Sequence, residues 1–340
     1  MITKPEINDE QIIDCLHDEY GLAVESISSL SLGADVDTSV YRVVAEGGTT
    51  YFLKLRRGNF GGASVTVPSF LSTSGMKQVI PPRTTKAGQL WADLNPFTAT
   101  LYPYVEGRAG LEEKMSRQQW FEFGSALKRF HTADIPVYIT GSIQRDEFSS
   151  RWRDSVKTHL EQVEGQVFHE QIKLEAATLL KSKKAEVLEV ANRAEELAHM
   201  LRAGPPEFIL SHGDIHGWNL LIDQKGALYI VDWDGLLFAP KERDLMFIGG
   251  GHGDSGYAPQ EEESMFYQGY GETNINQIAL AYYRYERIIL DIADDCDLIF
   301  WSAEGEETQA AALEDLQNKF LPGVYIEIAH RSDKVSTNRS

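Results

Sequence analysis

The stretch FILSHGDIHGWNLLIDQKGALYIVDWD, residues 208–234, decides how this chain folds. Its first apolar run, 208–210, predicts a strand, and a loop of polar residues and glycines follows over 211–219. Two further apolar runs, 220–222 and 228–231, are separated by a Lys-Gly turn and predict a hairpin. We therefore expect two rigid apolar ribbons that hold between them a loop rich in hydrogen-bonding groups.

Three oxygen-bearing side chains in this stretch follow an informative order. Asp214 and Asn219 belong to the loop, and Asp232 comes directly after the last apolar run. Phosphoryl transfer uses one carboxylate to orient and deprotonate the attacking hydroxyl, and two oxygen ligands for the Mg²⁺ that bridges the phosphates. The order therefore predicts Asp214 as the catalytic base, and Asn219 and Asp232 as ligands of Mg²⁺.

Length and composition are those of an ordinary soluble globular protein with a sizeable core. The chain has 340 residues, of which 42% are hydrophobic and 24% charged. The N-terminus lacks the apolar core of a signal peptide, and no apolar run approaches membrane-spanning length. Cys15 and Cys296 match no metal-binding spacing, and nothing calls for an oxidising compartment. We expect a cytoplasmic enzyme without a membrane partner, and the oligomeric state stays open.

Charge is distributed unevenly along the chain, whose net charge is −19. Over 207–307, twenty Asp and Glu stand against five Lys and Arg, a local balance of 5 − 20 = −15. Over 55–92 there is no acid, but there are five Lys and Arg. The acidic part argues against nucleic acid as a partner. Two interpretations stay open: a solvated acidic surface, or a basic region for nucleotide phosphates and an acidic region for a cationic substrate.

The ordered set of His212, Asp214, Asn219 and then Asp232 resembles the protein-kinase-like superfamily, and within it the aminoglycoside phosphotransferase family. Two further stretches, YYRYERI and APKERDLMFIGGG, are similar to those of its spectinomycin phosphotransferase subgroup. In the second of them, Asp244 resembles a structural position of the family, which anchors the helix after the metal-binding loop.

The resemblance implies an α+β, protein-kinase-like fold of two lobes. A small N-terminal lobe with an antiparallel sheet is expected over 1–105, and a larger, mainly helical catalytic and substrate-binding lobe over 106–330. From the residue pattern we also expect a strand over 324–328 and a disordered polar tail over 331–340.

The resemblance also implies how a nucleotide, ATP or GTP, is bound. Gly33 is expected in the loop over the phosphates, Lys54 of the strand YFLKL at the phosphates, and Tyr104 in the hinge segment that meets the base.

The glutamate that holds this lysine in kinases has no counterpart, because 55–92 contains no acid. Either the phosphates alone position Lys54, or another carboxylate takes the place of the glutamate, with Asp35 and Asp37 the nearest candidates.

Substrate-binding candidates come from the acidic part of the chain. Asp254 follows a glycine triplet, and the other candidates lie on a helix expected over 275–301: Tyr283, Glu286, Asp291 and Asp295. Carboxylates at this density on one helix repel each other. Either a cationic ligand or exposure to salt water would offset the repulsion.

Three functions compete. The first, which we favour, is transfer of the γ-phosphoryl group of a nucleoside triphosphate to a hydroxyl of a small cationic substrate, an aminocyclitol antibiotic such as spectinomycin, with antibiotic resistance as its consequence. The second is a metabolic kinase of the same fold, acting on choline, an amino sugar or homoserine. The third is a non-catalytic nucleotide-binding scaffold, against which the presence of Asp214, Asn219 and Asp232 argues.

Overall fold

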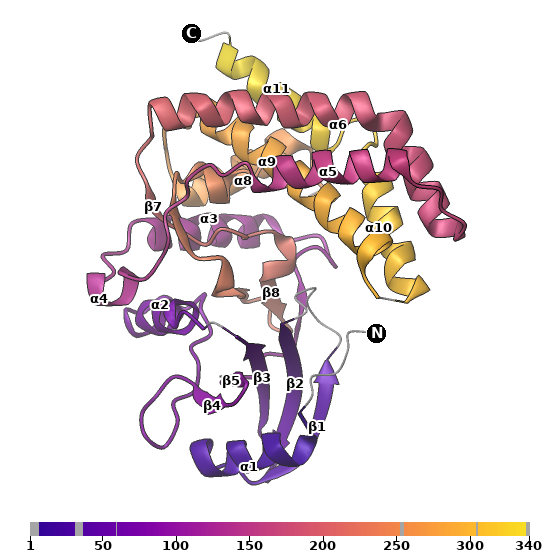
Figure 1. The fold of residues 1–340 in the computed structure, drawn as a ribbon. Helices are drawn as coiled ribbons and strands as arrows, with labels where there is room; N and C mark the ends of the chain where they lie inside the picture. Colours follow the sequence, from indigo (N-terminus) through magenta and orange to yellow (C-terminus); the bar gives the residue numbers. More distant parts are fainter. Residues whose placement is uncertain (1–6, 31–36, 59, 252–254, 304, 338–340) are drawn as a thin grey trace. The chain divides into compact units, whose positions relative to one another are not determined.

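The computed structural model describes residues 7–30, 37–58, 60–251, 255–303 and 305–337 (Figure 1). Packing within the chain divides it into two compact units. The first, here called the sheet unit, comprises Ile2–Gln144 and Asp214–Leu236. The second, here called the helical unit, comprises Arg145–Gly213 and Leu237–Ser340. The predicted lobes over 1–105 and 106–330 cut the chain at a different place and stay a prediction.

The sheet unit is built on a five-stranded antiparallel sheet in the order β1-β2-β3-β5-β4 (Figure 1). Its strands are β1 (Val24–Leu30), β2 (Thr38–Ala45), β3 (Thr50–Arg57), β4 (Ala92–Leu94) and β5 (Phe97–Pro103). Helix α1 (Asp9–Tyr20) packs its buried residues against the core-facing residues of these strands. Alternation along β3 buries Leu53 and Leu55 in that core and turns Lys54 to the opposite face.

The rest of the sheet unit carries the stretch that opened the sequence analysis. A three-stranded sheet has the order β6-β8-β9, with β6 (Gly107–Ala109), β8 (Leu220–Asp223) and β9 (Leu228–Ile230). The β8–β9 pair is the predicted hairpin, which is confirmed. The helices of this unit are α2 (Ala63–Thr73), α3 (Arg117–His131) and α4 (Val137–Thr140). Ser116 and Gln119 begin α3 with a capping box, and α3 packs against β9.

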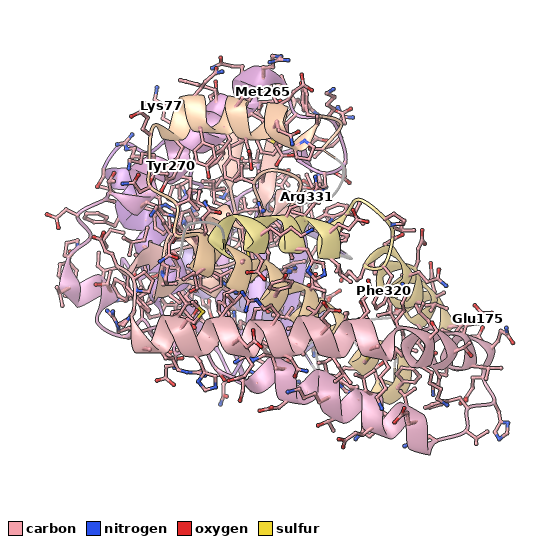
Figure 2. The ribbon with its side chains drawn as sticks, turned by 90° about the horizontal axis from the view of Figure 1, so that it is seen from above. Lys77, Glu175, Met265, Tyr270, Phe320 and Arg331 are labelled. Carbon is pink, nitrogen blue, oxygen red and sulfur yellow. The ribbon has the colours of Figure 1, made fainter. Side chains whose placement is uncertain are left out.

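The helical unit is centred on α9 (Gln277–Cys296), which packs against α5 (Arg151–Gly165), α6 (Gln171–Ala203) and α11 (Tyr325–Thr337). Figure 2 shows the 33-residue helix α6, on which Glu175 is labelled, and α11, on which Arg331 is labelled. The other elements of the unit are the paired strands β7 (Ile209–Ser211) and β10 (Leu237–Ala239), α7 (Glu242–Leu245), α8 (Pro259–Tyr270), the π-helical turn η3 (Asp297–Trp301) and α10 (Glu306–Asn318).

The predicted fold class, α+β with an antiparallel sheet near the N-terminus and a helical C-terminal region, is confirmed. The strand predicted over 324–328 is wrong, because residue 324 is a bend and 325–328 belong to α11. Ile326, Ala329 and Ser332 are buried at a spacing of three residues, which is a helical stripe. A short apolar run fits both periods, and packing of α11 against α9 selects the helical one. Of the predicted tail, residues 331–337 are helical and the rest lies outside the described residues.

Candidate active site

The loop between β7 and β8 joins Asp214 to Asn219 by direct contacts. The amide nitrogen Nδ2 of Asn219 donates to the backbone carbonyl of Asp214 at 2.7 Å. His216 lies between them: its Nδ1 accepts from the backbone N–H of Trp218 at 3.2 Å, and its Nε2 lies 3.3 Å from Oδ2 of Asp214. The imidazole thus contacts both the loop backbone and the carboxylate, which fixes the direction of the Asp214 side chain.

The hairpin brings the second part of the motif beside this loop. The backbone N–H of Val231 donates to the carbonyl of Asn219 at 3.0 Å, which extends the pairing of β8 with β9 by one step. The next residue, Asp232, has φ +59°, a left-handed conformation that a non-glycine residue adopts at a cost of about 1 kcal/mol or more. Strain of this kind is kept where the surroundings impose it, and here it directs a carboxylate out of the end of a strand.

A short 3₁₀ turn, η2 (Trp233–Gly235), anchors this carboxylate segment. The buried Trp233 ring packs edge-on against Phe130 of α3, with ring centroids 5.1 Å apart, and its indole N–H donates to the carbonyl of Ile230 at 3.2 Å. Asp232 and Asp234 on either side of this anchor are therefore held by a fixed backbone.

Lys54 of β3 meets both of these carboxylates. Its Nζ donates to Oδ1 of Asp232 at 2.8 Å and to Oδ2 of Asp234 at 2.7 Å. Burial alone would lower the pKa of this ammonium, but the two carboxylates outweigh burial and raise the pKa. Of the two alternatives that the sequence left open, the structure shows another carboxylate in place of the glutamate. Among the described residues, Asp232 and Asp234 supply it, and the candidate Asp37 does not contact Lys54.

Sequence reasoning missed a second cation in this cluster. Arg56 follows Lys54 on the same face of β3, and its Nη1 donates to Oδ2 of Asp234. Both signals were present in the sequence, since the alternation in YFLKLRR places the two cations together and Asp234 completes a D-x-D.

The oxygen donors of Asn219 and Asp232 would fit a magnesium ion that takes its remaining ligands from water and phosphate. Within the described residues, no group of three or more His, Cys, Asp or Glu could hold a metal ion by itself. Asn219 and Asp232 offer one amide and one carboxylate oxygen, since Nδ2 of Asn219 is engaged with the loop and leaves Oδ1 as its acceptor end. Mg²⁺ is commonly held by one or two such protein ligands and completes its octahedron with water and phosphate oxygens.

The entrance to the loop is fixed within the helical unit. Asp244 of α7 is fully buried, and its two carboxylate oxygens accept from the backbone N–H groups of His212 and Gly213, each at 2.8 Å. Gly213 has φ +85°, which a side chain would strain. Asp244 thus shapes the backbone directly before Asp214, and its expected role in anchoring the helix after the metal-binding loop stays a prediction.

Of the other predicted nucleotide-binding residues, Gly33 and the alternative partner Asp35 lie outside the described residues. Tyr104 is half-buried, its N–H donates to the carbonyl of Thr50 at 3.2 Å, and the guanidinium of Arg42 lies 5.5 Å from its ring centre. Its contact with a base stays a prediction.

The predicted substrate-binding residues of α9 are engaged within the helical unit. The hydroxyl of Tyr283 donates to Oδ2 of Asp146 at 2.9 Å, and burial raises the pKa of that hydroxyl well above its usual value. Glu286 is buried and accepts from Nη1 of Arg153, which is fully buried.

Two more carboxylates of α9 have basic neighbours. Asp291 lies 2.8 Å from Nε of Arg287, and Asp295 lies 3.7 Å from Nζ of Lys319. Burial, and to a smaller extent nearby carboxylates, raise the pKa of Asp295 to about 7 despite Lys319. A cationic substrate would compete with these partners, so substrate binding by this helix stays a prediction. Asp254 lies outside the described residues.

The chain is similar to known phosphotransferases in both sequence and structure. Residues 29–275 match the phosphotransferase enzyme family. The structure is similar to that of a spectinomycin phosphotransferase in complex with ADP and spectinomycin, with a TM-score of 0.88 and 29% identity over 97% of this chain and 100% of that one. Curated protein sequences gave no match.

Two more distant structures share the fold alone. An amicoumacin kinase in complex with AMP-PNP and Ca²⁺ aligns with a TM-score of 0.61 and 17% identity, over 94% of this chain and 97% of that one. A choline kinase from Streptococcus pneumoniae aligns with a TM-score of 0.53 and 16% identity, over 97% of this chain and 99% of that one. Within the described residues, no helix has the length and apolar character needed to cross a membrane.

Proposed function

The chain belongs to the phosphotransferase enzyme family, and from this premise we propose that it transfers the γ-phosphoryl group of a nucleoside triphosphate to a hydroxyl of an aminocyclitol antibiotic such as spectinomycin. The protein-kinase-like fold is confirmed, and the chain is a small-molecule kinase. The observation that carries the reaction is that two contacting pairs, Asp214 with Asn219 and Asp232 with Lys54, belong to one compact unit and are linked by the β8–β9 hairpin. The substrate class rests on the full-length similarity to the spectinomycin phosphotransferase.

The nucleotide would be held at the cluster that Lys54 forms with the D-x-D segment. Lys54 supplies a fixed positive charge for the phosphates, and Asn219 and Asp232 would hold Mg²⁺. When bound, the ion neutralises the charge that develops on the transferred phosphoryl group. Gly33 over the phosphates and Tyr104 near the base complete the nucleotide site that we propose.

Asp214 would act on the acceptor. Its carboxylate accepts the proton of the substrate hydroxyl while the hydroxyl oxygen bonds to the γ-phosphorus and the bond to the β–γ bridging oxygen breaks, releasing the nucleoside diphosphate. Two observations support this role: the side chain is 40% exposed, and His216 holds its direction through a 3.3 Å contact. The carboxylate is thus oriented by the protein and accessible to a substrate.

A panel of acceptors tests the proposal. Purified protein is incubated with Mg·ATP or Mg·GTP and with spectinomycin, other aminocyclitols, choline, ethanolamine, an amino sugar or homoserine, and the phosphorylated product is identified by mass spectrometry. We expect phosphorylated spectinomycin and none with the Asp214→Asn variant. Phosphorylation of choline or homoserine, with no reaction on the aminocyclitols, would instead establish the metabolic kinase.

A further inference from the structure

The carboxylates that contact Lys54 come from a part of the chain far from β3 and from the helix that follows it. Helix α2, which follows β3, reads ASVTVPSFLST and contains no acid. It packs against η2, the turn that carries Asp234. The carboxylates that reach Lys54 therefore come from the D-x-D segment, about 180 residues further along the chain.

The two carboxylates that contact Lys54 differ in their surroundings. The side chain of Asp232 is 49% exposed, sits on a left-handed backbone, and contacts the single cation Lys54 among the described residues. The side chain of Asp234 is 22% exposed and contacts two cations, Lys54 and Arg56. Ion pairs shielded from water are stronger than exposed ones, and two cations hold a carboxylate more firmly than one.

We propose that Asp234 is the positioning residue of Lys54, that Arg56 holds Asp234 in place, and that Asp232 alone leaves Lys54 when a magnesium-bound nucleotide is present. This inference rests on the proposed function of the site. It divides the D-x-D between two tasks, one carboxylate for the metal ion and one for the lysine.

The geometry makes this division consistent. Arg56 and Lys54 project from the same face of β3 and reach the same oxygen, Oδ2 of Asp234, so Asp234 cannot turn away without breaking two charged contacts. Among the residues that the structure describes, Lys54 is the one cation that Asp232 contacts. The buried indole of Trp233 anchors the segment from Asp232 to Asp234. This segment therefore fixes the distance between Asp234, which contacts Lys54, and Asp232, the proposed metal ligand.

A binding experiment that needs no acceptor tests the inference. Affinity for Mg·ADP is measured by calorimetry for the wild type and for Lys54→Met, Asp234→Asn and the double variant, at several Mg²⁺ concentrations. We expect Asp234→Asn to weaken binding about tenfold, and the double variant to bind no more weakly than Lys54→Met alone. Asp232→Asn should shift the Mg²⁺ dependence of binding, and Asp234→Asn should leave that dependence unchanged.

Arg56 supplies a second, independent arm. Arg56→Gln should weaken Mg·ADP binding about threefold, whereas Arg56→Lys should keep most of the wild-type affinity. In a protein that already carries Asp234→Asn, the additional change Arg56→Gln should not alter the affinity. Arg57→Gln, which removes the same charge from the exposed neighbour on the other face of β3, is the control and should bind as the wild type does. This arm remains decisive if Asp234→Asn does not fold.

Three results would overturn the inference: additive effects of Lys54→Met and Asp234→Asn, a shift of the Mg²⁺ dependence in Asp234→Asn as large as in Asp232→Asn, or unchanged binding in Arg56→Gln. The readout also separates this inference from the proposed function. A protein that binds Mg·ADP with coupled Lys54 and Asp234 but phosphorylates no member of the panel contradicts the proposed function alone.

Discussion

The carboxylates of the candidate active site and those of α9 look alike in the sequence and differ in the structure. Both groups lie in the acidic part of the chain, and both have basic partners. At the site, the side chains of Asp214 and Asp232 are 40% and 49% exposed, whereas on α9 those of Glu286 and Asp295 are 7% and 10% exposed. Asp234 of the site and Asp291 of α9, at 22% and 19%, lie between these extremes. The difference lies in solvent access and not in charge.

This difference separates carboxylates that can exchange partners from carboxylates that cannot. A partly exposed ion pair opens at little cost, because water solvates both charges as they separate. A buried pair opens only by leaving an uncompensated charge in a medium of low polarity. We therefore assign the chemistry to the first group and stability to the second, and each of the following experiments tests that assignment.

The largest effect is expected at Asp214. Changing Asp214 to Asn removes the proton acceptor with almost no change of shape, so turnover should fall about 1000-fold while Mg·ADP binding and the melting temperature stay near those of the wild type. Steady-state kinetics, calorimetry and thermal unfolding check the three parts. The comparison fails if the variant unfolds earlier or retains near-normal turnover.

The buried pair of α9 should show the opposite behaviour. Changing Arg153 to Met leaves Glu286 without its cation in the core, and the free energy of unfolding should fall by about 3 kcal/mol. Turnover per folded molecule should be unchanged. The control is Arg151→Met, which removes an exposed arginine from α5, the helix that also carries Arg153. Its free energy of unfolding should stay within about 0.5 kcal/mol of the wild type. Equal stability of the two variants in urea would contradict the assignment.

The pH dependence of stability tests Asp295. Its pKa of about 7 in the folded protein lies above its ordinary value of 3.8, so the folded state binds the proton more tightly than the unfolded state. The associated stability is fully present below about pH 4 and is lost as the pH rises through about 7. In the wild type, this loss lowers the free energy of unfolding between about pH 5 and about pH 8. In Asp295→Asn, the decrease over the same range should be smaller than in the wild type by about 2 kcal/mol.

Urea unfolding at the two pH values measures this effect. Glu314→Gln removes an exposed carboxylate from the neighbouring helix α10 and should leave the fall as it is in the wild type. A fall of the same size in Asp295→Asn and in the wild type would show that the buried carboxylate of α9 does not control it.

The smallest effect is expected at Asp244, which is buried and also contacts the loop of the candidate active site. It is buried like Glu286 and Asp295 of α9, yet it accepts from the two backbone N–H groups directly before Asp214. Asp244→Asn replaces one acceptor oxygen by a donor that faces an N–H, which should cost about 1 kcal/mol of stability and lower turnover about tenfold. Asp315→Asn, exposed on α10, is the control. A loss of stability without any loss of turnover would show that Asp244 does not shape the loop.

Much of the fold and part of the site could be predicted, because the signals were local. The two apolar runs on either side of a Lys-Gly turn predicted the hairpin β8–β9. Alternation in YFLKL is likewise local, and in the structure it separates Lys54 from the buried Leu53 and Leu55. The short run at 324–328 misled, because five residues fit a strand and a helix equally well until a neighbouring helix buries one face.

The sequence by itself determined the order of chemical groups and the elements that carry them, since both depend on neighbours a few residues apart. Only the tertiary structure decided their partners: Asp234 for Lys54, Arg153 for Glu286, and Asp244 for the backbone at Gly213. Local periodicity carries no information about which distant charge will lie opposite a given side chain. That choice is made when packing brings segments up to 180 residues apart to within 3 Å, and when burial sets what each contact is worth.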